Sequence, residues 1–150
     1  MRAHATILDA WLQKTVEIYP EQARGSIARS GDRFRNPVGY TVRESLATLV
    51  QELAGQMDVV RVADALEQIV RLRAVQDCTP AEAVCFVFLL RQIIREHNAE
   101  SYFPDLERRI DELALMTFDL YVKCREDIAL VRINEAKRAL SVRQRMRDQL

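Results

Sequence analysis

The chain has 150 residues, of which 49% are hydrophobic and 29% are charged, and its formal net charge is zero. This balance is that of one folded globular domain and excludes a disordered chain. A net charge of zero gives no global attraction to nucleic acid or to an anionic membrane, so we predict no nucleic-acid partner. Because there are only four glycines and four prolines, the composition favours long helices over many short strands.

The first predicted helix runs from about Ala3 to Tyr19, where apolar residues recur at helical spacing. Its stripe consists of Leu8, Trp11, Leu12, Thr15, Val16 and Tyr19. Pro20 is expected to end this helix and to open a short second one, from Glu21 to about Ala28. The segment from Arg29 to Tyr40 contains two glycines and a proline, which predict an ordered loop.

Two helices are predicted after this loop. Thr41 and Glu44 have capping-box spacing and predict a helix start, with Gly55 as its C-terminal stop. Asp58 can cap the next helix, from Val59 to about Val75. The residues of that helix expected to face the core are Val59, Val62, Ala63, Leu66, Ile69 and Val70. Those expected to face outward or toward a partner are Arg61, Glu67, Arg71 and Arg73.

The clearest helix start is the sequence Thr79-Pro80-Ala81-Glu82, with an N-cap threonine, a proline at the first helical position and a glutamate at the third. The helix that follows is apolar on all sides from Ala83 to Leu90 and ends near Asn98. This pattern predicts a central helix that neighbours cover on every side. The apolar run is too short to span a bilayer, so we predict no integral membrane segment.

Pro104 opens the last predicted helix, and no helix breaker follows before Leu150. This helix can reach roughly 40 residues, or about 60 Å at 1.5 Å per residue. A compact domain of this length is only about 35 Å across, so the end of the helix must project, pair with another chain or fray. Its apolar stripe consists of Leu106, Ile110, Leu113, Thr117, Leu120 and Cys124, and then shifts to Ile128 and Val131. We expect a helical domain at 1–131 and an Arg-rich extension of its last helix at 132–150.

Three stretches of the sequence resemble one protein family. They are Asp32–Thr41 (DRFRNPVGYT), Ile69–Asp77 followed by Thr79–Val84, and Arg109–Ala114 with Phe118–Glu126. Together they resemble the RsbRD N-terminal domain family, in which an NPVG loop, an R-x-R-A-V-Q-D turn and a D-x-Y-x-K-C-R-E helix recur. The resemblance spans most of the chain, from Trp11 to about Arg138, and its specificity rests on the three motifs in order.

The resemblance implies a fold and a function. Such domains are helical input modules that precede effector domains in stressosome-type co-antagonists of the kinase RsbT, and related RsbR input domains are dimeric and globin-like without haem. We therefore expect an all-α, globin-like bundle of five to six helices with a long C-terminal helix. No part of this sequence matches the STAS effector domain, so the chain is either a stand-alone member or an excised N-terminal domain. Free-standing relatives in sulfate-reducing bacteria leave open a role beside redox complexes.

One candidate ligand site lies at the end of a predicted helix, at Arg71, Arg73, Gln76 and Asp77. The arginines and the first turn of the Pro80 helix together can hold an anion or a small ligand. The alternative is structural: the arginines bond the last carbonyls of their own helix, and Asp77 caps or pairs with them. We favour the structural interpretation.

The redox candidates are Cys78 and Cys124. Lys123 and Arg125 flank Cys124 and can lower the pKa of its thiol, although its place in the apolar stripe favours a small buried side chain. Cys78 lies in a turn and is expected to be the most exposed of the three cysteines. The odd number of cysteines, without a Cys-x-x-Cys pair or clustered histidines, predicts neither a disulfide framework nor a metal. His97, the only histidine within the predicted body, lies in a polar setting, so we expect no haem or other cofactor.

The interaction candidates lie in the Arg-rich extension and in the apolar stripe just before it. Residues 132–150 carry six arginines and lysines against one glutamate and one aspartate. Such an excess of positive charge suits an acidic partner, a phosphate backbone or a membrane surface, and the simplest alternative is a solvated helix tail or a dimer contact. The candidates are Ile128, Val131, Arg132, Lys137 and Arg138.

The sequence contains none of the common catalytic motifs, such as a phosphate-binding loop or a nucleophile elbow. We therefore predict a cytoplasmic, non-catalytic signal-input or protein-docking module that is a homodimer and relays a signal through its last helix. The alternative function is a small-ligand or redox-sensing protein associated with a redox complex. The sequence leaves the stimulus, the partner and the direction of the response open.

Overall fold

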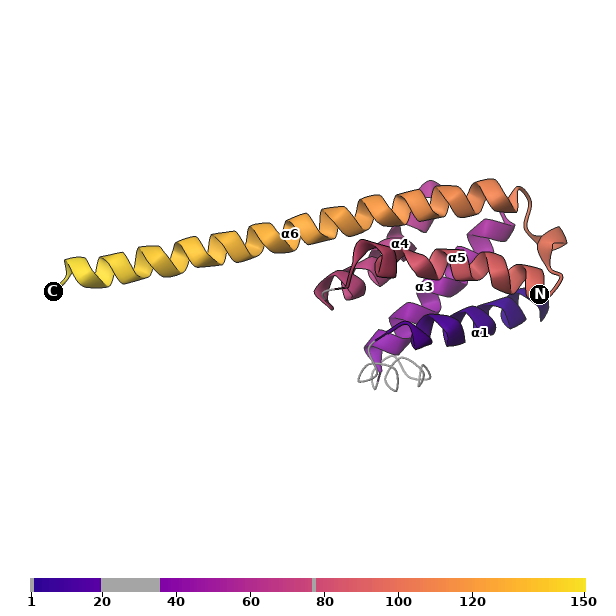
Figure 1. Cartoon of the computed structure of the whole chain (residues 1–150), viewed down its shortest axis with the longest axis horizontal. Helices are drawn as coiled ribbons and strands as arrows, with labels where there is room; N and C mark the ends of the chain where they lie inside the picture. Colours follow the sequence, from indigo (N-terminus) through magenta and orange to yellow (C-terminus); the bar gives the residue numbers. More distant parts are fainter. Residues whose placement is uncertain (1, 20–35, 77) are drawn as a thin grey trace.

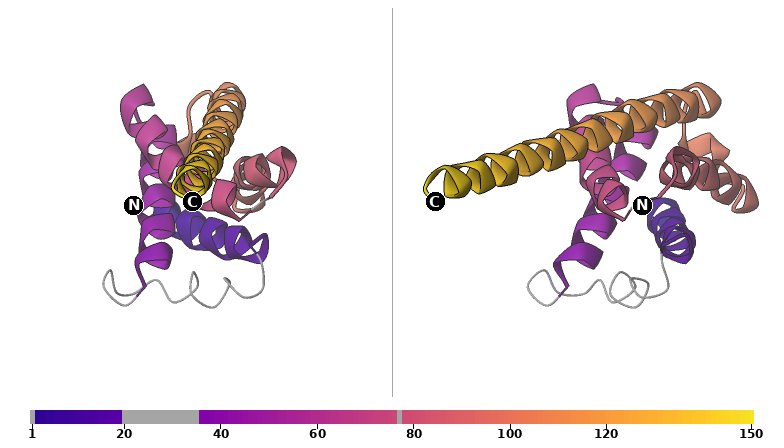
Figure 2. Two further views of the ribbon diagram at one scale, coloured as in Figure 1. Left: turned by 90° about the vertical axis from the view of Figure 1, so that its left-hand side faces the viewer. Right: turned by 60° about the vertical axis from the view of Figure 1, so that its left-hand side comes forward.

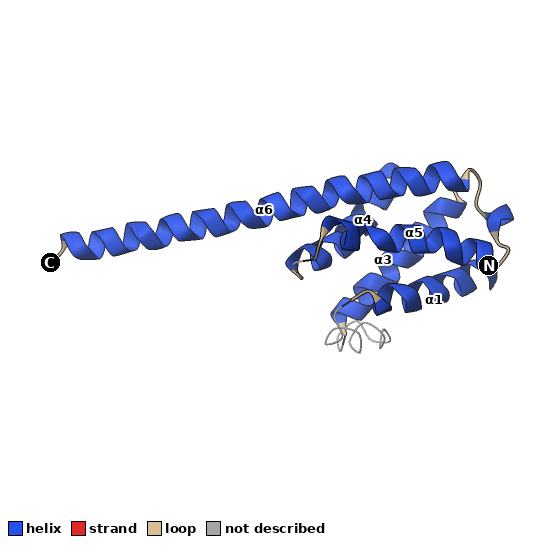
Figure 3. Cartoon of the chain, viewed as in Figure 1, coloured by secondary structure: helices blue, strands red, loops and turns tan. Residues whose placement is uncertain are grey.

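The structure is a computed structural model, and it describes residues 2–19, 36–76 and 78–150 (Figure 1). Across these ranges the chain forms five α-helices and one short 3-10 turn, with no strand (Figure 3). The elements are α1 (Arg2–Glu17), α3 (Pro37–Ala54), α4 (Val59–Val75), α5 (Pro80–Glu96), η1 (Glu100–Tyr102) and α6 (Leu106–Asp148). The predicted all-α class and the predicted long C-terminal helix are confirmed. The globin-like arrangement stays a prediction.

The helices form a body from which one helix projects (Figure 1). Within the body, α3 packs against α1 and α4, while α5 packs mainly against α1 and α6. Helix α6 runs along α4 and α5 and then continues far beyond them, as all views show (Figures 1 and 2). It has 43 residues, which at 1.5 Å per residue makes it about 65 Å long. The body is therefore packed on the first half of a helix whose second half leaves it.

The centre of the body is the contact between α1 and α5. The side chain of Trp11 is fully buried, and its ring stacks on that of Phe86 with 5.9 Å between the centroids. The indole Nε1 of Trp11 donates a hydrogen bond of 2.7 Å to the backbone carbonyl of Phe86. This pair therefore combines a large buried apolar area with a satisfied polar group.

Two predicted helix starts are confirmed in detail. The Asp58 carboxylate accepts hydrogen bonds from the backbone N–H groups of Val60 and Arg61 at the start of α4. At the start of α5, the Thr79 hydroxyl accepts from the N–H of Glu82, and the Glu82 carboxylate accepts from the N–H of Thr79. Both arrangements pair backbone donors that a helix otherwise leaves without partners.

The predicted start of α3 at Thr41 is wrong. The helix begins at Pro37, so the end of the predicted loop belongs to it, and its N-cap is Asn36, whose side chain accepts from the N–H of Gly39 at 3.0 Å. Proline is favoured in the first turn of a helix, where its missing N–H is not needed. The predicted helix from Glu21 to Ala28 and the first part of the predicted loop lie outside the described residues.

Several predicted faces also need correction. Val59 was expected in the core but is 66% exposed, whereas Arg73 was expected outside and is only 3% exposed. Helix α5 is not covered on every side, because Phe88 is 47% exposed. In α6, Tyr121 rather than Leu120 is the fully packed residue of its turn. Apolar character alone did not show which side of each helix lacks a neighbour.

The Trp11 contact provides a test of the core. Replacement Trp11→Phe removes the hydrogen bond to Phe86 and leaves a small cavity, so we expect the free energy of unfolding to fall by about 2–4 kcal/mol. Urea denaturation followed by circular dichroism measures this loss. The control is Val60→Ala, since Val60 is 69% exposed, and we expect it to change stability by less than about 0.5 kcal/mol. Equal effects of the two substitutions would contradict the placement of Trp11.

Candidate functional site

Two arginines of α6 bind the C-terminal ends of other helices. Nη1 of Arg109 donates to the carbonyls of Leu53 at 2.7 Å and of Gly55 at 2.8 Å, where α3 ends. Nη1 of Arg125 donates to the carbonyl of Ala74 at 3.0 Å, near the end of α4. A cation at a helix C-terminus satisfies free carbonyls and interacts favourably with the helix dipole. Helix α6 therefore caps α3 and α4 as well as packing against the body.

Where α6 leaves the body, it also holds the turn between α4 and α5. The Tyr121 hydroxyl donates a short hydrogen bond to the carbonyl of Cys78, and the Tyr121 side chain is only 3% exposed. The Cys78 thiol in turn donates to the carbonyl of Arg73 at 3.2 Å. We call this group of contacts the junction, and it consists of Ala74, Cys78, Tyr121 and Arg125.

The junction rests on a small core of its own, separate from the main one. This second core joins the end of α4, the start of α5 and the middle of α6. Its buried members are Val70, Ala74, Ala83, Tyr121 and Cys124, and Cys78, Leu120 and Ile128 pack against them. Beside it lies a surface hollow of about 450 Å³, between the start of α5 and α6. A shift of α6 at this point therefore moves the α4–α5 turn as well.

The predicted ligand site is brought together only in part. Arg71 points away from it and pairs with Glu67 at 2.8 Å, on the exposed side of α4. Arg73 is buried, its Nη1 donates to the Gln76 side chain at 3.1 Å, and its guanidinium lies 4.7 Å from the centre of the Tyr19 ring. Asp77 lies outside the described residues.

Arg73 has an unusual environment for a charged side chain. Within the described ranges it forms no ion pair, and its Nε atom is buried without a hydrogen-bond partner. The Tyr19 ring offers a cation–π contact, and burial raises the pKa of Tyr19 to about 12, with Arg73 acting in the opposite direction. A buried cation that lacks an anion is costly unless other groups compensate its charge.

Burial has the largest effect on the pKa of two of the three thiols, those of Cys85 and Cys124. Cys124 is 9% exposed, and burial raises the pKa of its thiol, although Arg71 and Lys123 act to lower it. Burial therefore outweighs the flanking Lys123, in agreement with the small buried side chain that the apolar stripe favours. Burial also raises the pKa of the Cys85 thiol. Cys78 is half-buried at the junction and Cys85 is half-buried on α5, so the expectation that Cys78 is the most exposed of the three cysteines stays a prediction.

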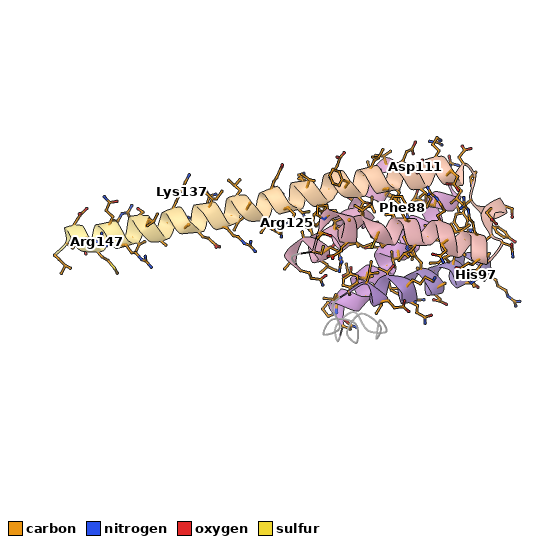
Figure 4. The ribbon with its side chains drawn as sticks, in the orientation of Figure 1. Phe88, His97, Asp111, Arg125, Lys137 and Arg147 are labelled. Atoms are coloured by element: carbon orange, nitrogen blue, oxygen red, sulfur yellow. The ribbon has the colours of Figure 1, made fainter. Side chains whose placement is uncertain are left out.

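His97 caps the C-terminal end of α5, is exposed, and has Nδ1 2.9 Å from the carbonyl of Ile93 (Figure 4). In the part of the chain that the structure describes, no group of three or more His, Cys, Asp or Glu side chains is placed to hold a metal ion. None of the helices in those ranges is both long and apolar enough to cross a membrane.

The interaction candidates divide into two groups. Ile128 is half-buried and packs on the second core, which ties it to the body. Val131, Arg132, Lys137 and Arg138 are exposed, as are all residues from 129 to 150. Figure 4 shows Lys137 and Arg147 on the part of α6 that extends beyond the body. Sequence reasoning did not identify Tyr121, Arg109 or Arg125 as contacts between helices.

The fold and the junction define a class of protein: an all-helical domain whose last helix belongs both to its core and to an exposed extension. The protein-family comparison matches residues 5–136 to the RsbT co-antagonist protein rsbRD N-terminal domain. The chain belongs to this family, as the three sequence motifs predicted, and the family is one of stressosome-type signalling domains. Comparisons with curated proteins and with solved structures found no match.

The thiols provide a test of the site. Only the thiolate reacts with iodoacetamide, and burial raises the pKa of Cys124, so we expect Cys124 to react at least about tenfold more slowly than an unfolded cysteine at pH 8. Because the folded pKa is raised, the stability from its neutral thiol is complete below the ordinary thiol pKa and is lost as pH rises through the folded pKa. Mass spectrometry of labelled peptides measures the rates, and the control is the chain in urea. Native labelling of Cys124 at the unfolded rate would contradict its burial.

Proposed function

We propose that this chain is a non-catalytic, cytoplasmic signal-input domain that acts on a protein partner through α6. The family supports the input role and protein partners. In this proposal residues 1–131 form the input domain and residues 132–150 form the extension that the partner contacts. The observation that supports transmission of a signal along α6 is the junction. There Tyr121 and Arg125, on one continuous helix, hold the α4–α5 turn.

The relay follows from the stiffness of a helix. A signal that changes the packing of α4 or α5 must change their contacts with Tyr121 and Arg125, or move α6 with them. Because α6 has no break between Leu106 and Asp148, a small shift at the junction is carried to the exposed extension. Coupling of this kind is reciprocal, so a partner bound to the extension must also act on the α4–α5 turn.

The partner is expected to bind the side of the extension that continues the core stripe. This side carries Val131, Val142 and Met146, which are all more than half exposed. Their spacing places them on the helical face of Cys124 and Ile128, which packs on the body. A partner helix can therefore add to the apolar surface that α4 and α5 cover nearer the body.

Affinity capture tests this proposal with the full chain as bait in native cells. We expect the wild-type chain to recover a STAS-domain protein or a stressosome-type kinase, and Val131→Asp with Val142→Asp to lose it at least about tenfold, because a buried carboxylate without a partner is costly. The matched control is Ser141→Asp with Gln144→Asp, on other sides of the same helix. Equal recovery by all three baits, or recovery of no signalling protein, would contradict the proposal.

Hydrogen exchange with the captured partner tests the relay itself. We expect the partner to slow exchange in residues 74–79 of the wild-type chain, although it binds the distant extension. In the variant Tyr121→Phe with Arg125→Met, the partner should still bind but should no longer protect the turn. Protection of the turn that is equal in both proteins would place the coupling elsewhere.

A second candidate function, binding of a small anion, is favoured by the environment of Arg73. Its buried Nε lacks a hydrogen-bond partner in the described part of the chain, and no carboxylate there neutralises its charge. Inorganic phosphate is a suitable probe, because a planar guanidinium binds such oxygen pairs well. Phosphate at 100 times its Kd should stabilise the fold by about 2.7 kcal/mol.

The test compares melting temperatures with and without phosphate at constant ionic strength. We expect a concentration-dependent increase for the wild type and none for Arg73→Met, which keeps the length of the side chain without its charge. Arg71→Met is the control, because Arg71 is exposed and already paired with Glu67. The same response in all three proteins would exclude a site at Arg73.

A further inference from the structure

The last turn of α4 buries a charged side chain at the boundary between the two cores. The Arg73 guanidinium lies 4.7 Å from the centre of the Tyr19 ring, which belongs to the main core. Val70 and Ala74, from the same part of α4, belong to the second core. Nη1 of Arg73 donates to the Gln76 side chain at 3.1 Å, whereas its buried Nε has no hydrogen-bond partner within the described ranges. One N–H donor of a buried cation therefore lacks an acceptor.

None of the described groups around Arg73 supplies a compensating negative charge. Gln76 is a neutral acceptor, and burial raises the pKa of Tyr19 to about 12, so its phenol stays protonated at neutral pH. The Cys78 thiol donates to the carbonyl of Arg73 at 3.2 Å. Burial raises the pKa of the Cys85 thiol, although Arg73 acts to lower it. A buried cation in such surroundings is costly, and a bound anion removes that cost.

The charge near Arg73 restricts which anion suits it. Two other arginines near this turn already have acceptors, because Arg71 pairs with Glu67 at 2.8 Å and Nη1 of Arg125 donates to the carbonyl of Ala74 at 3.0 Å. A monoanion therefore balances the single uncompensated charge of Arg73. A dianion would instead leave a net negative charge in the same buried place, which is again costly.

We infer that Arg73 binds a small monocarboxylate through the edge that carries Nε, an inference that rests on the anion binding proposed above. The Tyr19 ring covers a face of the guanidinium and Gln76 accepts from Nη1, so the ligand must approach from the Nε side. There Nε and Nη2 form a fork that matches the two oxygens of a carboxylate. Thr15, one turn before Tyr19 on the same side of α1, has a buried hydroxyl that also lacks a partner in the described ranges. Because Arg73 and Tyr19 are 3% and 1% exposed, the ligand must be as small as acetate or propionate.

This site is linked to α6 through Cys78. The carbonyl of Arg73 accepts from the Cys78 thiol, and the carbonyl of Cys78 accepts from the Tyr121 hydroxyl. A carboxylate at Arg73 therefore stabilises the end of α4 next to the turn that α6 holds. Local opening of this turn should become rarer when the ligand is bound, so hydrogen exchange in residues 74–79 should slow.

Titration of the full chain with acetate tests the site directly. Nuclear magnetic resonance detects the Nε–H groups of arginine, and we expect the Arg73 signal, assigned by its loss in Arg73→Lys, to shift with a millimolar Kd. Melting temperatures at constant ionic strength give the affinity of each variant. Arg73→Lys should bind acetate at least about tenfold more weakly, because lysine keeps the charge without the fork. Acetate should bind equally at about pH 6 and about pH 8, whereas phosphate should bind more weakly at the higher pH, where it is mainly a dianion.

A carboxylate built into the chain provides the matched variant. Gln76→Glu places a negative charge on the side chain that Arg73 already contacts. Without any ligand it should raise the melting temperature by about 2 °C or more and slow exchange in residues 74–79, and it should abolish the response to acetate. The control is Gln68→Glu, which makes the same charge change on the exposed side of α4 and should keep the response.

The outcomes separate this inference from the proposals on which it builds. An Arg73 signal that does not respond to acetate, an equal response in Gln76→Glu and the wild type, or tighter binding of phosphate than of acetate at the higher pH would overturn it. Binding of phosphate without acetate would retain the anion site and exclude only the carboxylate. Failure of both anions would contradict the anion site as well, and neither result depends on capture of a signalling partner.

Discussion

The burial of one face of α6 against α4 and α5 is the constraint on which the rest of the structure depends. Ile110, Leu113 and Thr117 are fully buried on this face, and the Thr117 hydroxyl is satisfied by the carbonyl of Leu113 at 2.6 Å. Each large aliphatic side chain buried in this way contributes about 1.5–3 kcal/mol. Because the same helix supplies the arginines that cap α3 and α4, separating α6 from the body would expose the core and uncap two helices together.

This constraint gives each side of α6 a different task. The core face holds the body together, and at Tyr121 and Arg125 it also holds the α4–α5 turn, so the body and the extension cannot move independently. The outer face carries exposed apolar residues on both halves, Leu115 and Phe118 beside the body and Ile133 and Leu140 on the extension. A helix that stops at the edge of the body could provide the first of these features but not the second.

Much of the fold follows from local signals in the sequence. Asp58 and the Thr79 capping box fix two helix starts by contacts within a few residues, and the lack of breakers after Pro104 gives the long helix. The start of α3 differs from the prediction because Pro37 is the first residue of the helix and not part of a loop, and Asn36 before it is its cap. Arg73, Arg109 and Arg125 could not be placed, since the Tyr19 ring and the helix carbonyls that they contact are 51 to 57 residues away in the sequence. The junction was missed for the same reason, because Tyr121 resembles any other aromatic residue in an apolar stripe.

Hydrogen exchange along α6, measured at a protein concentration at which the chain is monomeric, tests the central claim most directly. If one helix is shared between the core and an exposed extension, amides of residues 110–124 exchange only when the whole domain unfolds, at a rate that follows its free energy of unfolding. Amides of residues 130–146 then exchange at least about a hundredfold faster, because the extension has no tertiary contacts to protect it. Uniform protection along the helix, or rapid exchange in residues 110–124, would contradict the account.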